Sequence, residues 1–279
     1  MKYTLTHSLR AMLLTVILMS VGQRVSAQPR PPIPIAVRGA RATDVFQGSG
    51  GNCTVLSGIA AAARSGIDFT KRIRYLGKNR YPVGMFNAKR QYKLYLVYFD
   101  GSRLAVDANF NPRGPKESWV ILVNRAYFLS RGYKWTSPPN GRWAWQVLPA
   151  FTGGATKSFW RAAAWVAPEA KNVGKVFGND DLNRLRLATK TRRPVTAGIP
   201  PESAKQDKRL IGGHTYTVMG TYTRNVRMGK GQYKSVHWVV LRNPWGRDGG
   251  RIASGDPNDG LITLSWNDFR RLIGGYTIG

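Results

Sequence analysis

The chain has 279 residues and a single cysteine, which allows one sizeable domain or two lobes and excludes any disulfide within the chain. Its 43 lysine and arginine residues against 14 aspartate and glutamate residues give a formal net charge of +29, which attracts nucleic acid, anionic cell-surface glycans or acidic proteins. The charges are scattered, without long runs of one sign or a nucleic-acid-binding module, so we interpret them mainly as a solvated surface.

Residues 1–27 are typical of a secretory signal peptide, with Lys2 and Arg10 before an apolar stretch and small residues at the expected cleavage site, 25–27. The alternative is an uncleaved N-terminal anchor. This apolar stretch and every later one are too short to span a bilayer, so we expect a secreted or periplasmic protein without a membrane span. Removal of the signal, with its three basic residues, would leave a formal charge of +26.

Residues 28–43 are rich in proline and predict an extended lead-in that does not pack as an element of the fold. The same pattern also fits a short pro-segment or a cell-surface tether. A helix is then expected to start at Cys53, because Asn52 is a suitable N-cap, apolar residues follow at helical spacing, and Gly66 can end it.

Residues 44–150 predict a lobe that is mainly helical. Its other expected elements are a strand over residues 92–99, a second strand over 103–106 that completes a hairpin with it, and an amphipathic helix over 119–129. The remainder of this lobe is expected to consist of loops.

The pattern changes near residue 150, where Thr152-Gly153-Gly154 marks a turn, and residues 151–279 predict a lobe rich in β-structure. Strands are expected over residues 195–199, 214–222, 237–242 and 260–264. A helix over 180–189, with Asn179 as its cap, and a short helix or turn over 266–272 complete the prediction. Together the two lobes predict an α+β protein.

Cys53 is a candidate nucleophile because it follows a glycine-rich stretch, residues 47–52, and stands at a helix N-terminus. Unpaired N–H groups at such an end favour the thiolate, which is the reactive form of cysteine. A single cysteine is also familiar as a small buried apolar residue, and Cys53 taken alone slightly favours this inert interpretation. In an exported chain, a lone thiol is either accidental or retained for its reactivity.

A thiol nucleophile needs a base, for which histidine is suited by a pKa near neutrality. Beyond the signal the chain has two histidines, His214 and His237. His214 follows two glycines, which leave its ring approachable. His237 lies in an apolar run that predicts burial on both faces, as for a structural histidine. We therefore prefer His214 as the base.

The base needs a third group that orients its ring. Asn243 lies at the end of the same predicted β-region and can accept the ring N–H of His214, while Trp245 can cover that hydrogen bond from water. The Asn-Pro-Trp-Gly sequence is also an ordinary turn, and this pattern alone leaves both interpretations open.

Taken together, these patterns are similar to the protease core of the calpain family, which shares the order Cys, His, Asn with papain-like peptidases. Arg242-Asn243-Pro244-Trp245-Gly246 matches the family motif residue for residue. The other segments that resemble the family are the loop 47–53, the His214 motif 213–218, the helix 119–133, the turn 151–154 and the closing segment 261–269. The resemblance extends from about residue 44 to the C-terminus.

The resemblance implies a papain-like protease core with the active-site cleft between its two lobes. Cys53 would be the nucleophile, His214 the general base and then acid, and Asn243 its orienting partner. Gln47 would donate to the oxyanion hole, and Trp245 would shield the His214–Asn243 contact. The reaction would be hydrolysis of protein or peptide substrates through a thioester, by an endopeptidase that we expect to be a monomer.

The sequence departs from the family pattern in two respects: the residues on either side of the nucleophile, and the acidic residues that would bind calcium. The family usually has aspartate before the nucleophile and tryptophan after it, where this chain has Asn52 and Thr54. Calcium sites need six to eight oxygen ligands, and the segment after Trp245 has only Asp248, Asp256 and Asp259 to offer. We therefore expect residues 255–260 to form a plain turn, and neither a metal site nor a cofactor.

Two other functions remain open from the sequence. The positive charge fits a catalytically inactive peptidase scaffold that binds acidic polymers or anionic cell surfaces, although binding alone would not require Gln47, Cys53, His214 and Asn243 together. The same catalytic set also fits acyl transfer or cleavage of cell-wall peptides, but the motifs resemble calpains more closely.

Overall fold

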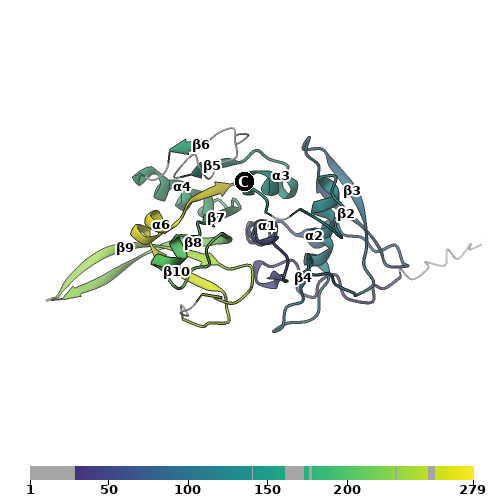
Figure 1. The fold of residues 1–279 in the computed structure, drawn as a ribbon, viewed down its shortest axis with the longest axis horizontal. Coiled ribbons are helices and arrows are strands. Elements are labelled where there is room, and N and C mark those ends of the chain that lie inside the picture. The colour runs from purple at the N-terminus through teal and green to yellow at the C-terminus, as the bar shows by residue number, and fades with distance from the viewer. Residues whose placement is uncertain (1–28, 140, 161–172, 176–177, 230, 251–254) are drawn as a thin grey trace, which may run out of the picture.

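The computed structural model describes residues 29–139, 141–160, 173–175, 178–229, 231–250 and 255–279, so the predicted signal peptide lies outside the described residues. Buried apolar side chains gather in two clusters, one drawn from residues 42–151 and the other from residues 182–278. Figure 1 shows the elements of the first cluster on the right and those of the second on the left. The mixture of helices and antiparallel sheet confirms the α+β class. Among the described residues, no helix has the length and apolar composition needed to cross a bilayer.

The elements around the first cluster are mainly helical. They are η1 (Ala42–Asp44), β1 (Phe46–Gln47), α1 (Cys53–Arg64), η2 (Phe69–Arg72), β2 (Arg80–Phe86), β3 (Tyr92–Tyr98), β4 (Ala108–Asn109), α2 (Trp119–Ser130) and α3 (Ala144–Thr152). The helices predicted at Cys53 and Trp119 are confirmed, whereas α3 was not predicted. The prediction that α2 is amphipathic is wrong, because residues 119–128 are all buried where α2 packs against α1, β2 and β3.

The predicted hairpin between residues 92–99 and 103–106 is also wrong. Strand β3 pairs with the preceding strand β2 instead, and residues 103–106 form a loop. The reason lies in α2, where the buried Arg125 donates to the carbonyls of Tyr98 and Ser102 and forms a 2.7 Å ion pair with Asp107. One guanidinium therefore holds both ends of this loop against the helix.

The predicted lead-in is extended, as expected, but it packs against the first cluster and so is an integral part of the fold. Ile33 and Ile35 contact that cluster. The carbonyls of Pro34 and Ile35 accept hydrogen bonds from the backbone N–H groups of Ser118 and Trp119, at 2.9 and 3.0 Å. These donors lie at the start of α2 and have no partner within the helix, so the segment completes the hydrogen bonding of α2.

The elements around the second cluster form one large sheet flanked by helices. They are β5 (Lys157–Trp160), β6 (Val173–Lys175), α4 (Asn179–Lys190), β7 (Val195–Ile199), α5 (Ser203–Gln206), β8 (His214–Gly229), β9 (Gln232–Arg242), β10 (Leu261–Ser265), α6 (Trp266–Leu272) and β11 (Gly275–Ile278). Within the described residues, the seven strands lie in the order β10-β9-β8-β7-β11-β5-β6, antiparallel except for the last pair.

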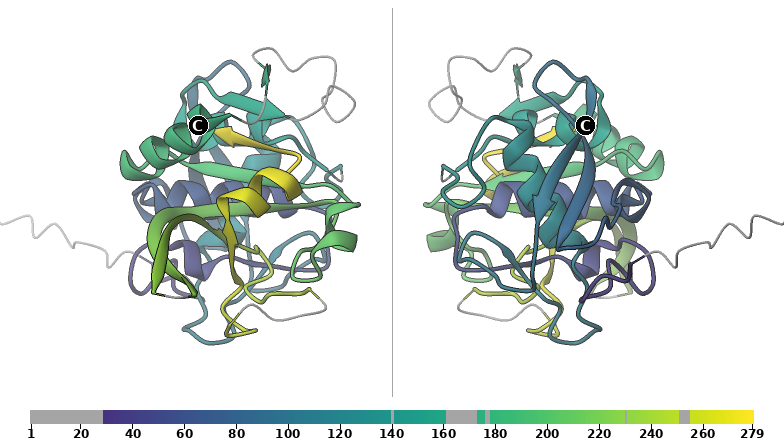
Figure 2. Two further views of the ribbon diagram at one scale, coloured as in Figure 1. Left: turned by 90° about the vertical axis from the view of Figure 1, so that its left-hand side faces the viewer. Right: turned by 90° about the vertical axis from the view of Figure 1, so that its right-hand side faces the viewer.

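Strand β7 and helix α6 have the predicted bounds, and α4 starts one residue earlier than predicted, so that Gly178, and not Asn179, precedes it. Strands β8 and β9 run well beyond the predicted ends and form a long ribbon. Figure 2 shows the molecule from two opposite sides: the β8–β9 ribbon faces the viewer in the left-hand view, and the β2–β3 ribbon does so in the right-hand view. The two ribbons therefore occupy opposite ends of the molecule. The outer part of β8–β9 is exposed and polar, and it lacks the apolar alternation by which a strand is predicted.

Helix α1 and strand β8 join the two parts of the chain. The Thr54 and Thr215 hydroxyl groups lie 2.9 Å apart, and the Ser57 hydroxyl donates to the Thr215 carbonyl at 2.7 Å. The Thr217 hydroxyl returns a hydrogen bond to the Ser57 carbonyl at 2.8 Å. These contacts hold the first turn of α1, which begins with Cys53, beside the start of β8, which begins with His214.

Candidate active site

Cys53 is the first residue of α1 and is partly exposed at the end of the glycine-rich loop. This loop passes so close to residues 105–107 that a Cβ at Gly48 would lie 2.5 Å from the Asp107 carbonyl oxygen, and one at Gly50 would lie 2.9 Å from Val106 Cα. Both separations are below the contact limit. Glycine is therefore required at both positions for the loop to present Cys53 as it does.

Asn52 precedes α1, but the prediction that its side chain caps the helix is wrong. Its amide nitrogen donates instead to the Val106 carbonyl at 2.7 Å and to the Asn124 side chain at 3.3 Å. Asn52 therefore ties the glycine-rich loop to the loop that Arg125 holds. No side-chain cap competes with the Cys53 thiol for the N–H groups at the start of α1.

His214 begins β8 and Asn243 directly follows the neighbouring strand β9, and His214 Nε2 is 2.9 Å from Asn243 Oδ1. The same oxygen accepts the Trp245 backbone N–H at 3.0 Å, and Asn243 Nδ2 donates to the Asp248 carbonyl at 2.8 Å. Because Asn243 Oδ1 can only accept, His214 Nε2 carries the proton in this contact, which leaves its Nδ1 able to accept one from a thiol.

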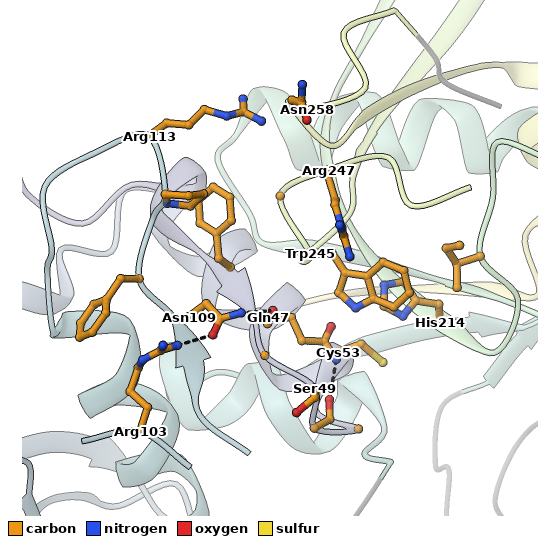
Figure 3. Close-up of a pocket in the computed structure, with 18 of the residues that line it drawn as sticks. Gln47, Ser49, Cys53, Arg103, Asn109, Arg113, His214, Trp245, Arg247 and Asn258 are labelled. Atoms are coloured by element: carbon orange, nitrogen blue, oxygen red, sulfur yellow. Dashed lines mark hydrogen bonds between the residues drawn. The ribbon is translucent and has the colours of Figure 1, made fainter. Parts of the chain in front are cut away.

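The Cys53 thiol and the His214 ring line the same cavities and are close enough for His214 to act on the thiol. Burial acts to raise the pKa of the Cys53 thiol. The interaction with His214 is the largest influence in the opposite direction, and the Thr215 backbone and the Thr54 hydroxyl add to it. Together these groups outweigh burial, so the pKa of the thiol is lowered. Figure 3 shows Cys53 and His214 at the edge of one cavity, beside Trp245. Cys53 and His214 thus share one cavity edge, and Asn243 holds the His214 ring from behind.

Aromatic rings cover the His214–Asn243 hydrogen bond. Between ring centroids, Trp245 lies 5.0 Å from His214, and Tyr216 lies 5.2 Å from it with the two rings nearly perpendicular. His214 and Asn243 are both buried. A hydrogen bond that is covered in this way is stronger than one exposed to water. Trp245 thus lies where it can shield the His214–Asn243 hydrogen bond.

Gln47 ends strand β1 and lines the same cavity as Cys53. Its backbone N–H donates to the Pro244 carbonyl at 2.8 Å, and its side-chain nitrogen donates to the Gly50 carbonyl at 2.7 Å. An amide nitrogen has two N–H groups, so one remains for an oxyanion formed beside Cys53. The structure therefore places Gln47, Cys53, His214 and Trp245 around one cavity, with the buried Asn243 behind His214.

Arg242 is a further residue that positions the site. It is buried at the end of β9, donates to the Val45 carbonyl at 3.0 Å, and lies over the Phe46 ring at 5.6 Å. Burial lowers its pKa to about 10, so it is still charged at neutral pH. Arg242 therefore links the end of β9, next to Asn243, to the start of β1, which ends with Gln47. Its place in the sequence motif does not reveal this role.

His237 lies elsewhere, on the β8–β9 ribbon, where its Nδ1 is 2.8 Å from the Thr223 hydroxyl. The ring is partly exposed, so the predicted burial on both faces is wrong. The reason is that the pairing of β9 with β10 ends at Trp238, so no further strand covers this side of His237. The hydrogen bond to Thr223 gives it a local partner, as a structural histidine needs.

Two cavities meet at Cys53, Gly213 and His214. The larger, of about 1200 Å³, is lined by Gln47 and Trp245. The smaller, of about 350 Å³, extends past Thr54 to Trp143 and Trp160. Thr54, which stands where the family resemblance leads one to expect tryptophan, lines this smaller cavity. Sequence analysis did not detect Trp143 or Trp160 as part of the site, because neither belongs to a pattern with Cys53 or His214.

A family model described as calpain family cysteine protease matches residues 23–252. The match covers most of the chain and includes all five site residues. Among curated proteins, a search finds no sequence that matches the chain.

Proposed function

The chain belongs to the calpain family of cysteine proteases, and we propose that it is an exported endopeptidase that uses Cys53 as its nucleophile. Its substrates are proteins or peptides, as the family indicates. The observation that carries the proposal is the placement of Cys53 and His214 at the edge of one cavity, with the His214 ring held 2.9 Å from Asn243. In this position His214 lowers the pKa of the Cys53 thiol. Structural cysteines have no need of such an arrangement.

The chemistry follows from these contacts. His214 takes the thiol proton, and the Cys53 sulfur attacks the carbonyl carbon of the scissile bond. The resulting oxyanion accepts hydrogen bonds from the Cys53 backbone N–H and the Gln47 side chain. His214 then gives its proton to the leaving amine as the carbon–nitrogen bond breaks, which leaves a thioester on Cys53. Water, deprotonated by His214, hydrolyses the thioester and restores the thiol.

Asn243 and Trp245 act on this sequence through His214. Asn243 holds the proton on Nε2, so that Nδ1 is free to exchange a proton with Cys53. Trp245 keeps water from competing for that hydrogen bond. An amide in this position adds no negative charge, so it orients the ring without opposing ionisation of the thiol.

Endopeptidase action is supported by the two cavities that meet at Cys53. An extended substrate can occupy space on both sides of the sulfur, whereas an exopeptidase needs one side closed by a group that recognises a chain terminus. Export is part of the same proposal and is supported by the signal-like pattern of residues 1–27.

Calcium is implied by the family, but the acidic residues after Trp245 do not suit a calcium site. Asp256 accepts the Asn258 backbone N–H at 2.9 Å, and Asp259 accepts that of Leu261 at 2.6 Å, so both serve local turns. Among the described residues, no group of three or more histidine, cysteine or acidic side chains could hold a metal ion. We therefore propose activity without bound calcium.

The purified mature chain is expected to hydrolyse an unfolded protein, to lose this activity when an epoxysuccinyl reagent modifies Cys53, and to keep it in the presence of a calcium chelator. Activity is followed by gel electrophoresis and the modified residue by mass spectrometry. Modification of Cys53 without hydrolysis of any unfolded protein would favour the inactive scaffold, whereas loss of activity in chelator with recovery in calcium would overturn the proposed independence of calcium.

Replacement of Gln47 with alanine is expected to lower kcat roughly a hundredfold, because the oxyanion loses one of its donors. Steady-state hydrolysis of a fluorogenic peptide measures the change. Ser49→Ala is the matched control, since Ser49 lines the same cavity and no role is assigned to its side chain. Equal kcat values for Gln47→Ala and the wild type would remove Gln47 from the oxyanion hole.

A further inference from the structure

The larger cavity has three arginines in its wall, which come from three separate segments. Arg103 lies in the loop after β3, Arg113 in the loop between β4 and α2, and Arg247 in the loop after β9. In Figure 3, Arg113 extends toward Asn258 and Arg247 lies between Asn258 and Trp245. Among the described residues, no aspartate or glutamate lines this cavity.

These three arginines are exposed. In the described part of the chain, none of them forms an ion pair with a carboxylate. Arg103 donates to the Asn109 side chain and lies over the Phe110 ring at 5.1 Å, which holds it in place without neutralising it. Other arginines of the chain are paired, such as Arg125 with Asp107 and Arg209 with Asp207.

The acidic loop that contributes Asn258 to this wall adds no carboxylate to the cavity lining. Asp256 and Asp259 flank Asn258, which lines the cavity, but both carboxylates accept backbone N–H groups of their own turn and neither lines the cavity. The amides of Asn109 and Asn258 add neutral donors to the same wall. This wall therefore has an excess of positive charge and hydrogen-bond donors.

The smaller cavity differs in character. Trp143 stacks on Trp145 with 4.8 Å between ring centroids, and Trp160 meets Trp143 edge-on at 5.6 Å. Arg142 is its one charged lining residue among those described. The two sides of Cys53 thus offer different surroundings, one largely apolar and aromatic and the other cationic.

Arginine keeps its charge at any physiological pH and binds carboxylates through two parallel N–H groups. A substrate with aspartate or glutamate in the larger cavity would gain these hydrogen bonds, while a basic one would be repelled. We infer, on the basis of the proposed peptidase activity, that the substrates are acidic on one side of the cleaved bond, with carboxylates bound by Arg103, Arg113 and Arg247. The same surface would slow hydrolysis of chains that are basic in this segment.

The inference is tested with three fluorogenic peptides that carry glutamate, glutamine or lysine at the same two positions on one side of the scissile bond and are otherwise identical. A second set of three peptides carries the same changes on the other side of that bond. We expect kcat/KM for the glutamate peptide to exceed that for glutamine about tenfold at low salt on one side only, with lysine lowest. The ratio should shrink in 0.5 M salt, since salt at about this concentration screens exposed charges. Equal values for the glutamate and glutamine peptides on both sides would overturn the inference.

The variant R103Q/R113Q/R247Q should reduce the ratio between glutamate and glutamine peptides to about one. The matched control R186Q/R224Q/R227Q removes the same charge from exposed positions that line neither cavity, and it should keep the wild-type ratio. If both variants lose the ratio equally, the preference comes from the net charge of the chain and the arginine wall is not a specific site.

A binding measurement separates this inference from the proposed activity. The Cys53→Ala variant should bind the glutamate peptide about tenfold more tightly than the glutamine peptide in fluorescence anisotropy, and the three arginine substitutions should abolish the difference. That result would support the acidic subsite even if no peptide is hydrolysed. Hydrolysis of the glutamine peptide without any preference would instead support the peptidase and reject the subsite.

Discussion

Replacement of Cys53 with alanine is expected to lower kcat/KM by about 10⁴-fold or more, because the covalent route through a thioester is lost. The chain has no second cysteine to take over the reaction. The fold should survive, since alanine suits the first turn of α1 and Cys53 is partly exposed. Hydrolysis of a fluorogenic peptide measures the loss, and the melting temperature should change by no more than about 3 °C.

Cys53→Ser is the informative companion to this variant. A hydroxyl can also donate a hydrogen bond to His214 but is far harder to ionise than a thiol, so this variant should be nearly as inactive as Cys53→Ala. Wild-type hydrolysis by Cys53→Ala would show that the chain is not a cysteine peptidase that acts through this residue. Loss of hydrolysis together with a collapsed melting transition would make the alanine result uninformative, and the serine variant would then decide.

Replacement of His214 with alanine is expected to lower kcat/KM by about 10³-fold or more and to raise the pKa of the Cys53 thiol. Burial acts to raise this pKa, and the interaction with His214 is the largest influence that lowers it. In the wild type the thiolate therefore persists to lower pH than for an ordinary thiol. Without His214, alkylation of Cys53 by iodoacetamide should require higher pH, and the midpoint of its pH profile should move upward.

The alkylation profile reports on Cys53 alone, because the chain has one thiol. His237→Ala is the matched control: His237 contacts Thr223 on the β8–β9 ribbon, so its removal should change neither the activity nor the alkylation profile. An unchanged profile in His214→Ala would mean that His214 does not act on the thiol, and the proposed base would then be wrong even if activity fell.

Much of the site could be predicted because its residues lie at ends of regular elements. Cys53 begins α1 and His214 begins β8, and Asn243 directly follows β9. Such boundaries have local signals in glycine, proline and apolar spacing. The pairing of His214 with Asn243 was predictable because both belong to one β-rich region, and neighbouring antiparallel strands bring such ends together.

The remainder depended on contacts between distant residues. Strand β3 was assigned the wrong partner because the decisive interaction is that of Arg125, on α2, with the loop between Tyr98 and Asp107. The packing of residues 29–41 rests on carbonyls that complete the start of α2, which proline content does not indicate. Arg103, Arg113 and Arg247 likewise meet only through the tertiary fold, so no spacing in the sequence could group them.

The single thiol has a consequence for oxidation. A cysteine that is partly exposed and has a lowered pKa is readily converted to a sulfenic acid, which many proteins rescue by condensation with a nearby second thiol. This chain has no second thiol, so the lesion on Cys53 can be reversed only by a reductant from outside, before further oxidation makes it permanent. The absence of any competing cysteine keeps the nucleophile free and also leaves its redox state entirely to the surroundings.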